Sequence, residues 1–296
     1  MFYYHPSYSA LALPERHRFP IDKYRLLKQL VSSFIDEQYF ITPQQATKAQ
    51  LTLCHNPAYV DAFLAGSLDS KAIKKMGFPW STELVKRTLY SVGASIQGAE
   101  FALQQGAAFN LSGGYHHAFT GYGSGFCIFN DLAIAAAYLI DTEQADTVLI
   151  FDCDVHQGDG TAEVTQLHPQ IICCSIHCQQ NFPRIKQQSN YDFALEHGTS
   201  DAEYLETVKQ ALALTIRLHQ PDIILYNAGA DIATDDELGH FQVSLEGVYQ
   251  RDYFVLNQAK KAKIPVFAAM GGGYQRNVSR LVDVHGQLFR AAVDLF

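Results

Sequence analysis

The chain has 296 residues, 48% of them hydrophobic and 18% charged, so it is long enough to bury a large core, and no linker or low-complexity segment divides it. Its formal net charge of −8 argues against general nucleic-acid binding, which requires a surplus of basic residues. No apolar run is long enough to cross a membrane, and residues 1–10 have Tyr and His where a secretion signal would be basic and then apolar.

Short apolar runs alternate with helical patterns along the chain, which is typical of a parallel sheet covered by helices. In chain order we expect a helix over 81–105, a strand over 107–111, a helix over 130–140, and strands over 147–151 and 171–175. The next expected element is a helix that begins with a capping box of Ser200 and Glu203 and ends at residue 218. It is followed by a strand over 222–226, a helix over 244–261 and a strand over 265–270. The aliphatic strands predict an α/β class in which helices cover both faces of the sheet.

Polar clusters follow these strands directly, and ligands of open α/β sheets bind beyond the carboxyl ends of the strands. The clusters, in strand order, are residues 113–117 with His116 and His117, residues 152–156, His177, residues 227–231 and residues 271–274. We therefore expect one edge of the sheet to carry histidines, aspartates and a tyrosine from separate parts of the sequence.

The segment Asp152-Cys153-Asp154-Val155-His156 suggests a metal site at a strand end. Alternate residues of an extended backbone point to one side, so we expect Asp152, Asp154 and His156 to gather there and to bind a divalent cation. The alternative is an acidic turn with a chance histidine. Considered alone, Asp231 would be a helix N-cap, and Tyr274, His177 and one residue of the His116–His117 pair would be structural.

Six motifs in this order resemble the zinc-dependent histone deacetylase superfamily, which shares the arginase-deacetylase fold: GGYHHA, SGFCIFND, DCDVHQGDG, SIH, NAGAD and GGGY. The early PERHRFPIDKY and the HQGDG form make the chain most similar to the class IV branch and its bacterial relatives. The resemblance runs from about Tyr4 to near the C-terminus. It implies one catalytic domain over residues 1–296, a single-domain three-layer α/β/α fold with a central, mostly parallel sheet.

The resemblance also implies roles for individual residues. The catalytic zinc would be bound by Asp154, His156 and Asp231, while Asp152 would orient His116 and Asp159 would orient His117. A structural potassium ion would be held by Asp152, by the backbone carbonyls of Asp154 and His156, and by Ser175 and Ile176. Gly125 and Phe126 match the wall of the family's substrate channel, and Phe182 would supply an opposite aromatic face.

These residues suit the hydrolysis of an N-acyl amide. Three protein ligands leave a zinc position open for water and for a substrate carbonyl. We expect His117 to act as the general base, His116 to give electrostatic support, and Tyr274 to donate a hydrogen bond to the oxyanion. The substrate would most simply be an Nε-acyl-lysine, with an acyl chain of acetyl length or longer.

Three alternatives differ in substrate or in class. An acetylated polyamine would fit an apolar channel as well as a lysine stem does. An arginase-like enzyme would need further aspartates for two manganese ions, and a non-catalytic protein would bind acylated ligands without turnover. We expect a cytoplasmic, prokaryotic protein with reduced cysteines and with no nucleic-acid or membrane partner. The sequence does not predict the oligomeric state.

Overall fold

A single sheet of eight strands organises the computed structural model, which describes all 296 residues. Every pairing is parallel, and the strand order is β2-β1-β3-β8-β7-β4-β5-β6. The strands are β1 (Phe2–Tyr3), β2 (Phe40–Ile41), β3 (Ala107–Asn110), β4 (Val148–Asp152), β5 (Ile171–Cys178), β6 (Tyr191–Leu195), β7 (Ile223–Asn227) and β8 (Val266–Ala269). The five predicted strands are present as β3, β4, β5, β7 and β8, so the prediction of a parallel sheet is confirmed.

Three strands were not predicted, and each lacks the signal on which the prediction depended. β1 and β2 have two residues each, which is too short to show a period. β6 lies at the edge of the sheet, where intermediate and exposed residues alternate and Asp192 interrupts the apolar run. Only strands buried on both faces read as continuous aliphatic segments.

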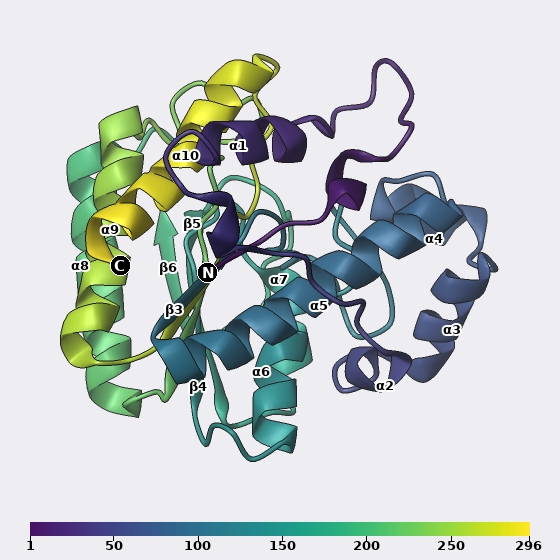
Figure 1. Cartoon of the computed structure of the whole chain (residues 1–296), viewed down its shortest axis with the longest axis horizontal. Helices are drawn as coiled ribbons and strands as arrows, with labels where there is room; N and C mark the ends of the chain where they lie inside the picture. The colour runs from purple at the N-terminus through teal and green to yellow at the C-terminus, as the bar shows by residue number, and fades with distance from the viewer.

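Helices lie on both faces of the sheet and complete the three layers (Figure 1). One side carries α1 (Lys23–Val31), α8 (Asp201–His219), α9 (Leu245–Ala262) and α10 (Val278–Leu295), and the other carries α5 (Thr82–Gln105), α6 (Asp131–Asp141) and α7 (Asp159–Thr165). The short helices α2 (Lys48–Leu51), α3 (Pro57–Ala65) and α4 (Ser70–Met76) lie outside α5 and α6. No helix combines the length and the apolar character that a membrane span requires.

The helix boundaries follow from their caps, with one correction. Ser81 and Asn130 accept hydrogen bonds from backbone N–H groups in the first turns of α5 and α6. Ser200 precedes α8, but its side chain makes no capping hydrogen bond, so the predicted capping box with Glu203 is wrong. The next residue, Asp201, instead accepts hydrogen bonds from the backbone N–H and the hydroxyl of Ser244, and thereby joins the starts of α8 and α9.

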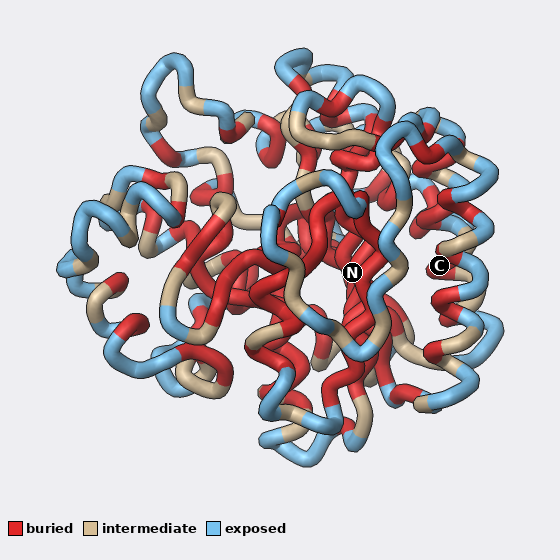
Figure 2. Tube along the Cα trace, turned by 180° about the vertical axis from the view of Figure 1, so that it is seen from behind, coloured by how far each residue is buried: buried red, intermediate tan, exposed pale blue.

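The register of the sheet brings the strand ends together above the core. Asp152, the last residue of β4, lies opposite Ser175 of β5 and Asn227 of β7. Asn227 in turn lies opposite Ala269, the last residue of β8, which pairs with Asn110 of β3. Beneath this edge, 79 buried residues form one hydrophobic cluster, visible as the red interior of Figure 2. The loops after β3, β4, β7 and β8 therefore leave the sheet side by side.

Candidate active site

Two carboxylates and an imidazole meet where the loops after β4 and β7 come together. One ligand atom from each of Asp154, His156 and Asp231 lies within 4.8 Å of the other two, and all three residues are buried. His156 Nδ1 is 3.0 Å from Asp154 Oδ1 and 3.2 Å from Asp231 Oδ2. This donor set suits a divalent cation such as zinc.

Asp152 does not join this cluster, so the prediction from extended geometry is wrong for that residue. β4 ends at Asp152 and the chain then turns, which breaks the alternation on which the prediction depended. The Asp152 carboxylate lies 2.7 Å from His116 Nδ1 and also accepts hydrogen bonds from Asn227 Nδ2 and the Asp154 N–H. Its place is taken by Asp231 from the β7 loop.

The cluster fits a metal ion by its packing as well as by its donors. Asp231 Oδ2 is buried and has no hydrogen-bond partner, although His156 is near. The backbone of Gly272 closes over the same atoms: a Cβ there would lie 2.3 Å from Asp231 Oδ2 and 2.5 Å from Asp154 Oδ2. A glycine at this position therefore preserves a cradle that a side chain would fill.

The electrostatics of the cluster also favour a bound cation. Burial, together with repulsion by the Asp154 carboxylate, raises the pKa of Asp231 to about 7. Burial alone would lower the pKa of His156, but its hydrogen bond to Asp154 and the nearby carboxylate of Asp231 raise that pKa to about 10. A metal ion between the carboxylates would supply this positive charge and take the place of the imidazole proton.

Two histidines stand beside the cluster, each paired with a carboxylate. His116 Nδ1 lies 2.7 Å from Asp152 Oδ2, and His117 Nδ1 lies 2.6 Å from Asp159 Oδ1. The two ring centroids are 4.1 Å apart, and His116 Nε2 is 3.6 Å from Asp154 Oδ1. Because each Nδ1 faces a carboxylate, each Nε2 is free to face the cluster.

The two imidazoles have opposite pKa shifts. Burial would lower the pKa of His116, but the carboxylates of Asp152 and Asp154 outweigh it and raise that pKa to about 9. Burial, reinforced by the charge on His116, lowers the pKa of His117 to about 4 despite the carboxylate of Asp159. One ring therefore favours the charged form and the other the neutral form, which is how paired groups divide acid and base roles.

Tyr274 completes the site from the loop after β8. Its ring centroid lies 6.4 Å from that of His156 and 5.8 Å from that of Phe126. Burial raises the pKa of the Tyr274 phenol well above its ordinary value, which keeps the hydroxyl protonated. The Tyr274 N–H donates a 2.6 Å hydrogen bond to Asp236, which also accepts from the N–H groups of Leu238 and Gly239.

The three predicted channel residues line one cavity of about 450 Å³ that opens over the cluster. Phe182 packs edge-on against His117 with ring centroids 4.8 Å apart, and Phe126 lines the same cavity. Gly125 has a positive φ of 52°, and a Cβ there would lie 2.8 Å from the His117 ring. Phe126, Phe182 and Tyr274 give the cavity aromatic faces beside His117 and His156. The rest of the lining is largely polar and includes Arg18, Asn181, Glu237 and His240.

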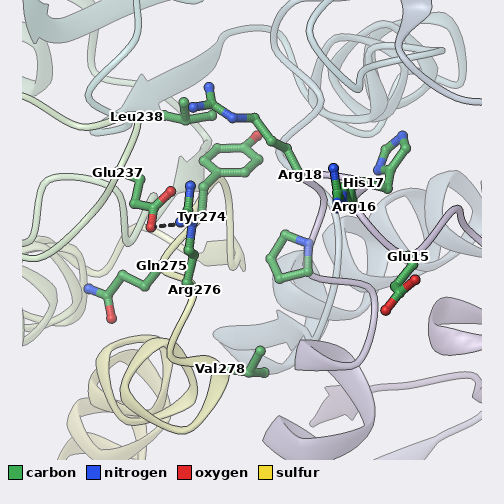
Figure 3. A pocket seen from close by; sticks show the side chains of 11 residues that line it. Glu15, Arg16, His17, Arg18, Glu237, Leu238, Tyr274, Gln275, Arg276 and Val278 are labelled. Atoms are coloured by element: carbon green, nitrogen blue, oxygen red, sulfur yellow. Dashed lines mark ion pairs between the residues drawn. The ribbon is translucent and has the colours of Figure 1, made fainter.

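A second cavity of about 450 Å³ adjoins the channel, with which it shares Arg18, Glu237, Leu238 and Tyr274. Three arginines line it, Arg16, Arg18 and Arg276, and Figure 3 shows Arg18 beside the Tyr274 ring. Arg276 pairs with Glu237 at 2.8 Å, whereas no carboxylate lies within ion-pair distance of the other two. Glu15 also lines this cavity, so three arginines stand against two glutamates and the charge beside the channel mouth is only slightly positive.

His177 lies within a strand and takes no part in the cluster. β5 continues to Cys178, so His177 does not follow the strand as predicted. It is buried, with Nδ1 3.0 Å from Ser175 Oγ, and burial lowers its pKa to about 4. These contacts favour the structural alternative.

Asp131 anchors the loop that carries both histidines, a role that sequence reasoning missed. Its carboxylate accepts hydrogen bonds from the N–H groups of Gly114 and Tyr115 and from Ser95 Oγ, at 2.6 to 3.2 Å. A Cβ on Gly113 would lie 2.5 Å from Asp131 Oδ2, so the loop passes close to the carboxylate. The sequence signal for this residue is its place as the last residue of the SGFCIFND motif.

Arg251 holds the loop that carries Asp231 by hydrogen bonds to the backbone of that loop. This buried residue of α9 donates hydrogen bonds to the carbonyl of Gly229 at 2.6 Å and to the carboxylate of Asp252 at 2.9 to 3.0 Å. Tyr226 on β7 donates to the same carboxylate. The apolar period of the helix predicted its buried face but gave no sign of a buried ion pair within it.

Comparison with known proteins shows which family and which solved structures the chain resembles. Residues 17–288 match the histone deacetylase domain family. An uncharacterized protein of Picosynechococcus is 43% identical over 295 residues, which are 99% of this chain and 98% of that protein. The acetoin utilization protein AcuC of Staphylococcus aureus is 31% identical, with 90% of this chain and 75% of AcuC covered. The crystal structure of an HDAC homolog from Aquifex aeolicus shares the fold, with a TM-score of 0.81 at 22% identity over 98% of this chain and 83% of that one.

Proposed function

The chain belongs to the histone deacetylase domain family, and on that premise we propose that it is a zinc-dependent amidohydrolase that removes an acyl group from Nε-acyl-lysine. The observation that carries the proposal is the combination at one sheet edge of a buried ligand cluster, two carboxylate-paired histidines and a tyrosine, next to a channel that Phe126 and Phe182 line.

In this proposal Asp154, His156 and Asp231 hold the zinc ion. Their carboxylate oxygens and imidazole nitrogen suit a divalent cation, and Asp231 Oδ2 has no hydrogen-bond partner within the protein. When bound, zinc polarises the substrate carbonyl and acidifies water. A structural potassium ion, held by Asp152, Ser175, Ile176 and the carbonyls of Asp154 and His156, is part of the same proposal. The register of β4 and β5 supports it, since Asp152 lies opposite Ser175.

The histidines divide the proton transfers between them. His117, whose pKa is lowered to about 4, is neutral at pH 7 and accepts the proton of the attacking water at Nε2. Asp159 holds the His117 ring in that tautomer through Nδ1. His116, paired with Asp152, keeps a positive charge beside the reacting carbonyl and supports the protonation of the leaving amine.

Tyr274 stabilises the oxyanion. Its protonated phenol donates a hydrogen bond to the carbonyl oxygen as charge develops there, an interaction worth about 3 kcal/mol for comparable oxyanion donors. The hydrogen bond from the Tyr274 N–H to Asp236 fixes the backbone that carries this donor. The reaction then ends with a free amine and a carboxylate.

The channel suits an aliphatic stem between Phe126 and Phe182, which lysine and acetylated polyamines both provide. The mouth supports lysine by a small margin, because its three arginines outnumber its two glutamates and a net positive charge repels the remaining ammonium groups of a polyamine. Three ligands in one cluster also support a single metal ion over the two-manganese arrangement of an arginase.

The test is amine release from acetyl-lysine peptides and acetylated polyamines by zinc-loaded protein, with Tyr274→Phe in parallel. We expect turnover of the peptides and a loss of about 10²- to 10³-fold in kcat for the variant. Tight binding of the peptide without turnover would instead identify a non-catalytic binding protein. Two manganese ions per chain in a metal analysis would support the arginase alternative.

A further inference from the structure

The segment between β5 and β6, residues 179–190, brings Phe182 to the wall of the channel. The Phe182 ring centroid lies 4.8 Å from that of His117 and 6.2 Å from that of His156. Phe182 is nevertheless 44% exposed and Ile185 is 77% exposed, so the two large apolar side chains of the segment bury little surface. Polar contacts therefore hold Phe182 against the site.

Gln157, the residue after His156, provides the main polar contacts through one side chain. Its Nε2 donates hydrogen bonds to the Gln187 carbonyl at 2.7 Å and to Asp192 Oδ1 at 2.8 Å. Its Oε1 accepts a hydrogen bond from the Gln187 N–H at 2.8 Å. Both donors and an acceptor position of the carboxamide are thus used. Because Gln157 is only 1% exposed, water cannot readily replace these hydrogen bonds.

Lys186, next to Gln187, extends this hold to the residues beside Phe182. Its Nζ donates hydrogen bonds to the carbonyls of Asn181 at 2.7 Å and Pro183 at 3.0 Å. These two residues precede and follow Phe182 in the chain. The backbone that carries the ring is therefore connected through Lys186 and Gln187 to the loop of the ligand cluster.

The start of the segment has a separate attachment. Asn181 Nδ2 donates a 2.7 Å hydrogen bond to the Leu238 carbonyl in the loop after β7. Loss of the Gln157 carboxamide would therefore release residues 183–190, while the chain stays attached at Asn181. Phe182 lies where these two parts meet.

We propose that Gln157 is a positioning residue, whose buried carboxamide holds the segment 179–190 against the ligand loop and keeps Phe182 at the channel wall. The consequence for catalysis rests on the proposed amide hydrolysis, in which the substrate stem passes Phe182. The carboxamide bonds to Gln187 and Asp192, and not to the ligand cluster. Its loss should therefore weaken substrate binding more than it slows the chemical step.

The first experiment follows the segment in the full-length protein without substrate. Trypsin cleaves after Arg184 and Lys186, and the rate of cleavage rises with local opening. We expect Gln157→Ala to be cleaved at these sites about tenfold faster than the wild-type protein, with the fragments identified by mass. Gln179→Ala, which changes an exposed glutamine at the start of the same segment, is the matched control and should be cleaved at the wild-type rate.

A second variant distinguishes hydrogen bonding from packing. Gln157→Glu keeps the size of the side chain but places a carboxylate against the Gln187 carbonyl and the Asp192 carboxylate. We expect it to be cleaved as fast as Gln157→Ala. It also carries the comparison if the alanine variant does not fold, which far-UV circular dichroism checks.

Kinetics with an acetyl-lysine peptide test whether Gln157 acts through Phe182. Gln157→Ala should raise KM about tenfold and lower kcat less than about threefold. In a Phe182→Ala background the same substitution should change KM little, because the ring that it displaces is already absent.

The two experiments separate this inference from the proposed function. Faster cleavage of both Gln157 variants, with no hydrolysis of the peptide by any of the proteins, would overturn the proposed function and retain the positioning of the segment. Wild-type cleavage rates in both variants would overturn the inference alone. So would an equal rise in KM with and without the Phe182 ring.

Discussion

His55 links the stability of the protein to pH. Its Nδ1 donates a hydrogen bond to the Phe119 carbonyl and its Nε2 accepts one from the Asn130 N–H, so the buried ring is held neutral. Burial lowers its pKa from 6.5 to about 4. Between these values the unfolded chain binds a proton that the folded protein does not, so the contribution is complete above pH 6.5 and is lost as pH falls toward 4.

We predict that His55 accounts for a loss of about 2 kcal/mol in the free energy of unfolding between about pH 7.5 and about pH 5. The comparison is with His55→Gln, whose amide reproduces one donor and one acceptor without titrating. Urea unfolding of both proteins at the two pH values measures the difference. An identical pH dependence in the two proteins would contradict the assignment to His55.

At the scale of elements, the loop of His116 and His117 depends on the first turn of α6. Asp131→Ala would leave the N–H groups of Gly114 and Tyr115 and the Ser95 hydroxyl without their acceptor, which costs about 1 to 3 kcal/mol for each buried group. We therefore expect a lower melting temperature and a loss of kcat, because the histidines would no longer be held in place.

Two further variants make this prediction specific. Asp131→Asn keeps one oxygen acceptor and should retain more activity and stability than the alanine variant. Asp141, the exposed residue at the other end of α6, is the control, and Asp141→Ala should change neither kcat nor the melting temperature. Equal effects of the two alanine substitutions would refute the anchoring role of Asp131.

The buried strands could be predicted from the sequence because a strand covered on both faces contains mostly aliphatic residues. The ends of the strands and helices could not be predicted in this way. β4 and β7 are covered on both faces, so each reads as an aliphatic run. The turn after Asp152 depends on contacts with His116 and Asn227, which are distant in sequence, and alternation within the segment could not predict it. Local patterns likewise placed Ser200 before α8 but missed that Asp201 bonds to another helix.

For the whole molecule, we expect metal binding to stabilise the fold. The ligands come from the loops after β4 and β7, so a bound ion joins two parts of the sheet edge that separate on unfolding. At a free zinc concentration about 100 times the Kd, the free energy of unfolding should rise by about 2.7 kcal/mol. Thermal unfolding of the chelated and zinc-loaded protein measures this rise.

The matched variants are Asp231→Asn and Asp235→Asn. Asp231 belongs to the ligand cluster, whereas Asp235 is an exposed acid that pairs with Arg280 at 3.4 Å. Zinc should raise the melting temperature of Asp235→Asn as much as that of the wild-type protein and should have little effect on Asp231→Asn. A similar rise in both variants would place the stabilising ion elsewhere.

We also propose that residues 1–296 form one cooperative domain that includes the outer helices α2 to α4. Trp80, the single tryptophan, follows α4 and donates a hydrogen bond to the Phe63 carbonyl in α3. Phe78 beside it packs on Phe19 with ring centroids 4.8 Å apart and so joins these helices to the site. We expect tryptophan fluorescence and far-UV circular dichroism to report the same urea transition. An earlier fluorescence change would show that the outer helices unfold separately.

The ribosome releases β8 last of all the strands, although β8 occupies the middle of the sheet between β3 and β7. Until residues 266–269 emerge, β2-β1-β3 and β7-β4-β5-β6 are two separate groups with unpaired edges. A chain that ends before this point has neither the continuous eight-stranded sheet nor Tyr274. We therefore expect truncated chains to lack the proposed activity and to expose unpaired strand edges, which favour aggregation.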